Sequence, residues 1–284
     1  MAASPAIQKI AHHSRSISLP SRSHPLTLRV EEQLCHLRSS ELATSSSSSV
    51  CHNLAGLKDL YDCVDDLLQS SLAQNSISSG HGKHVDRILD GSLKVLDVCG
   101  NTRDILSQMK QSLQDLQSCV RRRGAESSVA NEASTYTISR KKGNKMIHKC
   151  LADIKKMEQN VSIDENKIVT ILSEVEEITL AMFESILSFI SGIKATRSKR
   201  NSWSLVSKLM HIKPQEEKDT TEVVKADVAL NILMSRKPCK AVDVKNIQEP
   251  LEALEMSIQA VEFGLNCLFR SLIKTRVSLL NTLN

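Results

Sequence analysis

The C-terminal stretch LEALEMSIQAVEFGLNCLFRSLIKTRVSL (residues 251–279) decides the fold. Its aliphatic residues recur at spacings of four and three, which places them on one face of a helix. We predict that this helix starts near Pro250, because proline is tolerated in a first turn. Burial of eight aliphatic side chains contributes about 12–24 kcal/mol gross, so the helix must pack centrally in a bundle or against another molecule. The stripe is Leu251, Leu254, Ile258, Val261, Leu265, Leu268, Leu272 and Leu279, interrupted at Thr275.

The same spacing recurs upstream and predicts further amphipathic helices. One starts at Leu26, and the next carries Val50, Leu54, Leu57, Tyr61, Val64 and Leu68. Gly100 is expected to end a helix over 83–98, which includes an inward Leu93, and the following helix carries Ile105, Met109, Leu113, Leu116 and Val120. Another helix is expected over 134–159. Ser162 to Glu165 has the pattern of a capping box for a helix that runs to Gly192, and a short helix is expected over 223–234.

The composition agrees with helices. Of 284 residues only 2% are aromatic, and there are only 9 Gly and 6 Pro to form turns. We therefore predict an all-α antiparallel bundle of about six to eight long amphipathic helices with a disordered basic N-terminus. The expected organisation is a Ser/Arg-rich tail (1–25), N-terminal helices (26–123), a linker (124–133), central helices (134–193), a basic flexible loop with a short amphipathic helix (194–221) and C-terminal helices (222–284).

No pattern in the sequence indicates a catalytic, cofactor or metal site. The eight cysteines contain no CxxC pair, so we interpret them as reduced thiols in a reducing compartment. His81 and His84 lie one turn apart, but no third ligand is near. Gly-rich phosphate loops, G-x-S-x-G and H-E-x-x-H are absent from the sequence. We predict a protein that is not an enzyme, and an enzyme with an unrecognised site stays open as an alternative.

The charge pattern gives little support to nucleic-acid binding. The net charge is +5, and aromatic residues for base stacking are scarce. The basic cluster of Arg140, Lys141, Lys142 and Lys145 has no accompanying recognition motif, so we interpret it as a solvated helix face. The acids Asp65, Asp66, Glu174, Glu176 and Glu177 are likewise expected on exposed faces.

The sequence predicts a cytoplasmic protein. No secretory signal is visible, and the apolar run from Ile178 to Ile193 is short for a bilayer and contains Glu184. Residues 1–30 contain Lys9, several arginines and many serines but no acid, which suits either an organelle transit peptide or a disordered regulatory tail. We favour the tail, and the transit peptide stays open.

The sharpest motif lies in this tail, where Arg15, Ser16, Ser18 and Pro20 match the R-S-x-S-x-P pattern that 14-3-3 adaptors bind. Phosphorylation of Ser18 would add about −1.5 to −2 charge and three acceptor oxygens for an arginine cluster. Arg15 suits a basophilic kinase, and Pro20 would turn the chain out of the groove. A chance match in a Ser/Arg-rich tail is the alternative.

The second candidate is a membrane-surface contact between 194 and 210. Four cations precede an apolar face that would form on a short helix, which is the pattern of a basic anchor beside an amphipathic wedge. Ser202 follows the cations and would be a kinase site that weakens such an anchor. The alternative is that Trp203 and its neighbours dock on the bundle. The residues are Lys194, Arg197, Lys199, Arg200, Trp203, Val206, Leu209 and Met210.

Four ordered segments resemble the plant BYPASS-like family, a plant-specific domain of unknown function. They are RSISLPSRSHP (15–25), FESILSFISG (183–192), SWSLVSKLM (202–210) and the ending CLFR (267–270) with RVSLLN (276–281). The resemblance spans most of the chain. It implies a helical protein connected with root and shoot development, and it carries no catalytic residues over to this sequence.

These observations lead to one main functional hypothesis and two alternatives. The main hypothesis is a non-enzymatic interaction or regulatory protein of plant development, controlled by phosphorylation of its tail. The first alternative is a peripheral membrane or trafficking scaffold that uses residues 194–210 as its contact. The second is the enzyme with an unrecognised site.

Overall fold

The computed structural model describes residues 24–40, 46–78, 82–122, 126–158, 166–192, 221–235 and 241–282. These residues form eight α-helices, so the all-α prediction is confirmed. The N-terminal tail up to residue 23 and most of the loop predicted over 194–221 lie outside the described residues. The helices are α1 (Pro25–Ser40), α2 (Ser47–Leu68), α3 (Ser71–Ser78), α4 (Gly82–Arg121), α5 (Glu126–Glu158), α6 (Lys167–Ser191), α7 (Glu222–Ser235) and α8 (Ala241–Thr282).

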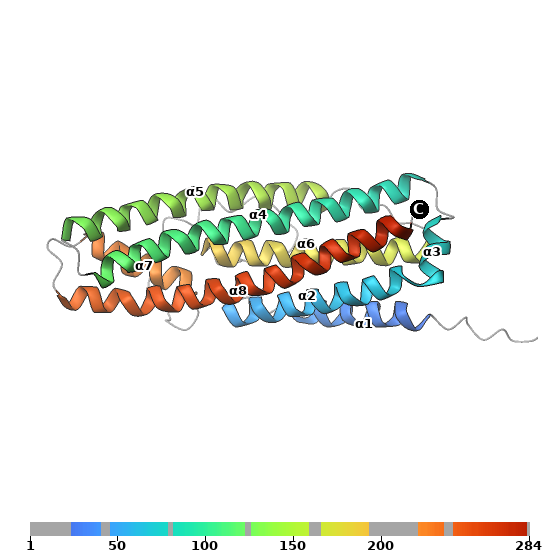
Figure 1. The fold of residues 1–284 in the computed structure, drawn as a ribbon, viewed down its shortest axis with the longest axis horizontal. Helices are drawn as coiled ribbons and strands as arrows, with labels where there is room; N and C mark the ends of the chain where they lie inside the picture. The colour runs from blue at the N-terminus through green and yellow to red at the C-terminus, as the bar shows by residue number, and fades with distance from the viewer. Residues whose placement is uncertain are drawn as a thin grey trace, which may run out of the picture.

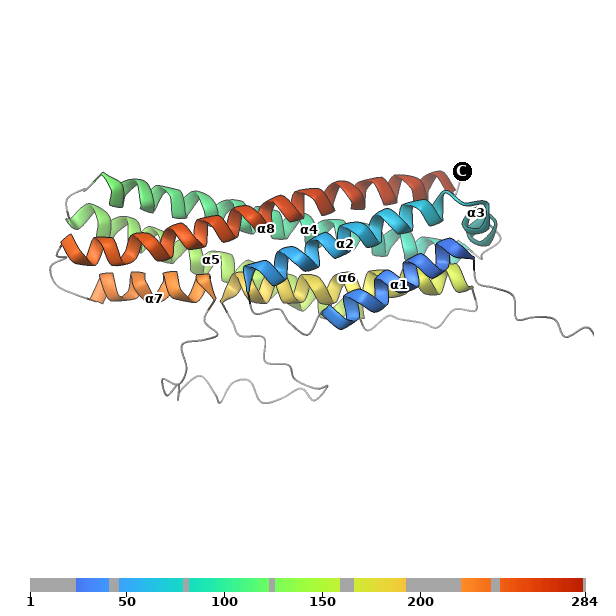
Figure 2. The ribbon, with the colours of Figure 1, turned by 90° about the horizontal axis from the view of Figure 1, so that it is seen from below.

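The helices lie side by side in an elongated bundle (Figure 1). The chain reverses direction between α4 and α5, and α8 runs antiparallel to α4. In the view from below, α7 continues along the line of α6, while α1 and α2 lie together over α6, toward the end of the bundle away from α7 (Figure 2). The antiparallel arrangement follows from short connections between long helices.

Helix α8 is central, because it packs against α2, α4 and α7. All eight aliphatic residues of its predicted stripe are buried, which confirms the inward face. Thr275, the polar interruption, is also buried, and its hydroxyl donates to the carbonyl oxygen of Tyr61 on α2 at 3.3 Å. A polar side chain is therefore tolerated in the stripe because a neighbouring backbone carbonyl accepts its proton.

The two ends of α6 differ in how well the sequence predicted them. Gly192 ends the helix in the left-handed conformation with φ 74°, as expected. At the start, the predicted capping box at Ser162 lies outside the described residues, and the cap of α6 is Asn166. The Asn166 side chain accepts from the backbone N–H of Ile168 at 3.0 Å and donates to the carbonyl of Ser76 on α3 at 2.9 Å. Because one amide side chain makes both contacts, the start of α6 is tied to α3.

The predicted break at Gly100 is wrong, since α4 continues through it to Arg121. Val98 and Cys99 are buried on one side of Gly100, and Thr102 on the other side donates to the carbonyl of Val98 at 2.7 Å. Packing of these neighbours against the bundle outweighs the weak helix preference of one glycine. Leu93 was expected to face inward, but 45% of it is exposed.

Two other boundaries and one whole helix also differ from the sequence prediction. The linker over 124–133 is wrong for 126–133, because α5 starts at Glu126 and buries Val129 and Ala133. The last helix starts at Ala241 rather than near Pro250, and Pro250 lies within it. Helix α3 was not predicted; it follows Ser70, whose hydroxyl accepts from the backbone N–H of Ala73 at 3.3 Å. Where buried residues lie on both sides of a position that locally disfavours a helix, their packing outweighs that local preference and the helix continues.

Candidate functional site: a buried arginine at the end of α6

Arg140 is the most deeply buried arginine of the described chain, with 8% of its surface exposed. It points from α5 into the bundle, so its assignment to a solvated face is wrong. The physical reason is its register. Ala133, Tyr136 and Ile147 are buried on the same face of α5, and Arg140 falls between them at helical spacing.

The Arg140 guanidinium joins three helices. Nη2 lies 3.0 Å from Oδ2 of Asp227 on α7, whose side chain keeps 37% exposure. Nη1 donates to the carbonyl of Ile190 at 3.0 Å, and Nη2 donates to that of Ser191 at 3.4 Å. These are among the last carbonyls of α6, which lack a partner within their own helix. Arg140 therefore caps α6 and pairs with α7 at the same time.

The chain leaves α6 and enters α7 beside this arginine. A Cβ atom added to Gly192 would lie 3.3 Å from Cγ1 of Val223 and 3.7 Å from Nη2 of Arg140. The residues that flank segment 193–220 therefore meet at one place on the bundle. The left-handed turn at Gly192 makes this close approach feasible, because a side chain there would be strained and crowded.

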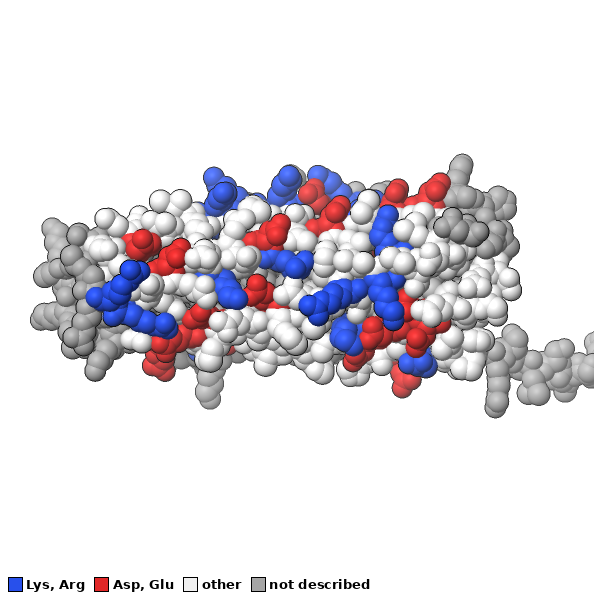
Figure 3. Space-filling model, in the orientation of Figure 1, with Lys and Arg blue, Asp and Glu red and all other residues white. Residues whose placement is uncertain are grey.

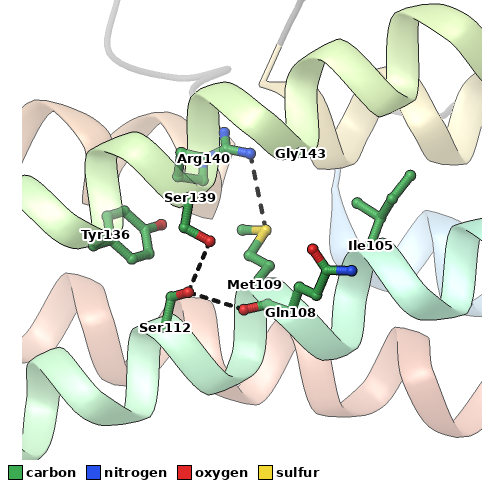
Figure 4. Close-up of a pocket in the computed structure, with 8 residues that line it drawn as sticks. All are labelled: Ile105, Gln108, Met109, Ser112, Tyr136, Ser139, Arg140 and Gly143. Atoms are coloured by element: carbon green, nitrogen blue, oxygen red, sulfur yellow. Dashed lines mark hydrogen bonds between the residues drawn. The ribbon is translucent and has the colours of Figure 1, made fainter.

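A small cavity of about 10 Å³ lies between α4 and α5 next to Arg140. The close-up shows Ser112 and Ser139 joined across it by a hydrogen bond of 2.8 Å, and Nη1 of Arg140 directed at Sδ of Met109 at 3.8 Å (Figure 4). The hydroxyl of Tyr136 has no hydrogen-bond partner among the described residues. Burial raises the pKa of this phenol well above its ordinary value, and the Asp227 carboxylate adds to that increase. The lining residues are Ile105, Gln108, Met109, Ser112, Tyr136, Ser139, Arg140 and Gly143.

This site positions helices, and the Tyr136 hydroxyl is the one buried side-chain polar group of its lining that lacks a hydrogen-bond partner among the described residues. A volume of that size holds about one water molecule, which would satisfy the Tyr136 hydroxyl. The guanidinium donors already meet Asp227, two carbonyls and the Asn144 side-chain oxygen, at 3.4 Å for Asn144. A phenol with a raised pKa stays protonated at neutral pH, so it is a poor base.

A second buried charge lies between α2 and α8. Asp65 is 1% exposed and was expected on a surface, so that prediction is wrong. Its carboxylate accepts from Nζ of Lys274 at 2.8 Å, from Nε2 of Gln69 at 2.7 Å and from the hydroxyl of Ser278. Three donors replace the lost hydration, which is how a buried carboxylate is tolerated. Asp65 thus fixes the register of α8 on α2.

The remaining predicted acids have different surroundings. Asp66 is exposed and pairs with Arg29 at 3.2 Å, and Glu174 pairs with Arg38 at 3.0 Å. Glu177 is exposed. Glu176 is partly buried against Gly91, and burial raises the pKa of its carboxyl while Lys94 and Arg87 lower it. The exposed-face prediction therefore describes Asp66 and Glu177, and it is wrong for Asp65.

The described cysteines carry no disulfide. All seven described cysteines are free thiols, and burial raises the pKa of Cys99 to about 12. A thiol with so high a pKa is unreactive at neutral pH. In the described ranges no three His, Cys, Asp or Glu side chains are placed to hold a metal ion. His81 lies outside those ranges, and His84 is in the first turn of α4. None of the described helices has the length and hydropathy needed to cross a bilayer.

The sequence-predicted contact residues lie outside the described chain. These are the tail motif Arg15, Ser16, Ser18 and Pro20, and the residues from Lys194 to Met210. Sequence reasoning missed the Arg140 cluster, although a signal was present. Arg140 falls in the apolar register of Ala133, Tyr136 and Ile147, and a cation at such a position is usually paired.

Comparison with known proteins gives a family. The family model described as Protein BPS1 matches residues 53–282, from within α2 to the end of α8. No curated protein and no solved structure matches the chain. The match spans most of the chain and includes both buried-charge clusters, and on this basis the chain belongs to the BPS1 family.

Proposed function

We propose that this protein is a non-enzymatic interaction protein of plant root and shoot development, controlled by phosphorylation of its N-terminal tail. The observation that carries the proposal is the small size of the cavity between α4 and α5 in the described part of the chain. The cavity beside Arg140 has a volume of only about 10 Å³, whereas sites for small molecules have volumes of about 300–1,000 Å³. The partners of such a protein meet it at its surface and its tail.

The buried charges support the same proposal. The carboxylate of Asp65 and the guanidinium of Arg140 are both occupied by protein partners. A catalytic acid or base must instead reach a substrate atom. Membership of the BPS1 family agrees with a developmental role. The groups whose pKa burial raises most, Tyr61, Cys99 and Tyr136, are all buried in the core between helices.

The tail motif supplies the proposed control. Ser18 lies seven residues before Pro25, where α1 begins, and a fully extended chain of that length would span up to about 24 Å. That reach is sufficient for the phosphoserine to enter a groove on another protein. The two charges of the phosphate and the nearby Arg15 provide the recognition by 14-3-3 adaptors.

The proposal is tested by titrating the full chain with a 14-3-3 protein by calorimetry. The chain phosphorylated at Ser18 is expected to bind at micromolar concentration or tighter, and the unphosphorylated chain is expected not to bind. Phosphorylation at Ser16 alone is the matched control, because it adds the same charge two positions before the serine of the pattern. Equal binding of all three forms, or no binding, would contradict the adaptor role.

A peripheral membrane scaffold that uses residues 194–210 is the second candidate. It is favoured by the closeness of the two flanks, since a Cβ atom added to Gly192 would lie 3.3 Å from Cγ1 of Val223, so the chain leaves and re-enters the bundle at one place. Four cations near an anionic bilayer give about 1 kcal/mol each, so the amphipathic part must supply the remainder. Neutralising Lys194, Arg197, Lys199 and Arg200 should abolish vesicle binding if this segment is the contact.

A further inference from the structure

The outer side of α5 carries a row of lysines that no described acid neutralises. Lys141, Lys142, Lys145 and Lys149 are all exposed, and we call them the lysine ridge. None of the four takes part in an ion pair within the described part of the chain. Elsewhere on α5, Lys156 pairs with Asp153 at 3.1 Å.

The ridge lies on one side of the helix because of its spacing. Successive residues are rotated by about 100°, so positions 141, 145 and 149 stay on the face opposite Tyr136 and Arg140. That face is the outside of the bundle. Figure 3 shows lysine and arginine side chains along the upper edge of the molecule, where α5 runs in Figure 1. From Lys141 to Lys149 the ridge is about 12 Å long.

An exposed apolar residue lies at one end of the ridge. Ile138 is 65% exposed and precedes Lys142 by one helical turn. Next to it on α5, the Thr137 hydroxyl lies 3.9 Å from Sδ of Met234 on α7, and Met234 is 39% exposed. Free cations beside exposed apolar side chains match the headgroup and acyl boundary of a bilayer.

The geometry points to a contact between the lysine ridge, with Ile138, and an anionic lipid surface. This inference is independent of Ser18 and names a surface other than residues 194–210. A protein partner fits less well, because protein interfaces are depleted of lysine and enriched in aromatic residues and arginine. The ridge lies on the convex side of a helix, so it offers no groove for a peptide helix. Nucleic-acid readers add arginine forks or stacking Phe, Tyr or Trp side chains, and none of these is exposed on this face of α5.

The expected binding is weak, reversible and dependent on salt. Each lysine near an anionic surface raises the partition coefficient about fivefold, so the four together account for roughly several hundredfold. Screening shortens the range of this attraction as the ionic strength rises. The neighbouring strip of α4 has the exposed acids Asp97 and Asp104 beside exposed Ser107, Gln108 and Gln111, so two acids oppose the four lysines there.

The test is co-sedimentation of the full chain with phosphatidylcholine vesicles that contain phosphatidylserine, at low and physiological ionic strength. The ridge variant replaces Lys141, Lys142, Lys145 and Lys149 by Gln, and we expect it to lose the binding shown by the wild type. The matched control removes four positive charges elsewhere, on α4, directly after its end, on α7 and on α8, and should bind within about fivefold of wild type. Its exposed positions are Lys94, Arg122, Lys225 and Arg270.

A spectroscopic measurement identifies the contact directly. In a Trp203→Phe background, Ile138→Trp should shift its emission to the blue with phosphatidylserine vesicles and stay unchanged with phosphatidylcholine alone. The inference is overturned if the ridge variant binds like the wild type, including the case in which only neutralisation of residues 194–200 abolishes binding. Absence of vesicle binding together with ridge-dependent capture of a polyglutamate peptide would also overturn it, in favour of an acidic protein partner.

Discussion

Replacing Arg140 by Met should destabilise the bundle by about 3 kcal/mol, because the methylene stem is kept while every polar contact is lost. Removal of one partner of a buried ion pair costs about 3–5 kcal/mol. The Asp227 side chain is 37% exposed and can be rehydrated, so the lower end applies. The carbonyls of Ile190 and Ser191 lose their charged donor as well. A domain of this size has a free energy of unfolding of about 5–15 kcal/mol, so the loss is substantial.

Urea unfolding followed by circular dichroism at the helix band measures this loss. The matched control is Lys141→Met, which removes a neighbouring exposed cation and should change the free energy of unfolding by no more than about 0.5 kcal/mol. In the Arg140→Met background, Asp227→Asn should recover about 1 kcal/mol, since it removes the carboxylate left without its partner. If Arg140→Met is as stable as Lys141→Met, the guanidinium does not join α5, α6 and α7 as described.

Three further changes test other parts of the structure. Gly264→Ala should destabilise the chain by about 1–3 kcal/mol, because the new Cβ would lie 2.9 Å from Cδ1 of Leu54. Gly100→Ala should stabilise the chain by about 0.5–1 kcal/mol, since no atom lies within 4 Å of the new Cβ. If Gly100→Ala instead lowers the free energy of unfolding in urea, a helix end at Gly100 is indicated. Asp65→Ala should lower the free energy of unfolding by about 2–3 kcal/mol. Asp66→Ala, at the neighbouring exposed position, should lower it by less than about 1 kcal/mol. Equal losses would show that Asp65 does not hold α8 on α2. Burial raises the pKa of Glu176 from its ordinary 4.5, so the folded chain holds this proton more tightly than the unfolded chain. The contribution of Glu176 to the free energy of unfolding therefore falls as the pH rises above 4.5 until the raised pKa is passed, and Glu176→Gln should flatten this part of the pH profile; an unchanged profile would contradict the burial.

The fold was predictable because its main signal is redundant. The eight aliphatic residues from Leu251 to Leu279 recur at spacings of four and three over many turns, so the inward face can be recognised despite one polar residue in the stripe. Breaker residues were harder to interpret. Gly100 and Pro250 favour helix ends locally, but the flanking residues pack on other helices, and that tertiary contribution is not visible in a local pattern.

The register of Arg140 on α5 could have indicated a buried charge, but the partners of the buried charges were not predictable, because sequence gives a charge without its partner. Arg140 meets carbonyls that lie 50 and 51 positions further along the chain, and Ser278 meets Asp65 across 213 positions. Only the fold brings these groups together. The tail motif and residues 194–210 stay predictions, since both lie outside the described residues.

The most direct test of the central claim, that this protein acts through surface and tail contacts, is affinity capture from plant root tissue with mass spectrometry. Wild type, Ser18→Ala and Arg140→Met would be compared, the last at a temperature where it stays folded. We predict that 14-3-3 proteins are captured by wild type and Arg140→Met and are lost from Ser18→Ala. Capture that is unchanged by Ser18→Ala but lost with Arg140→Met would contradict the account, because function would then depend on the buried site.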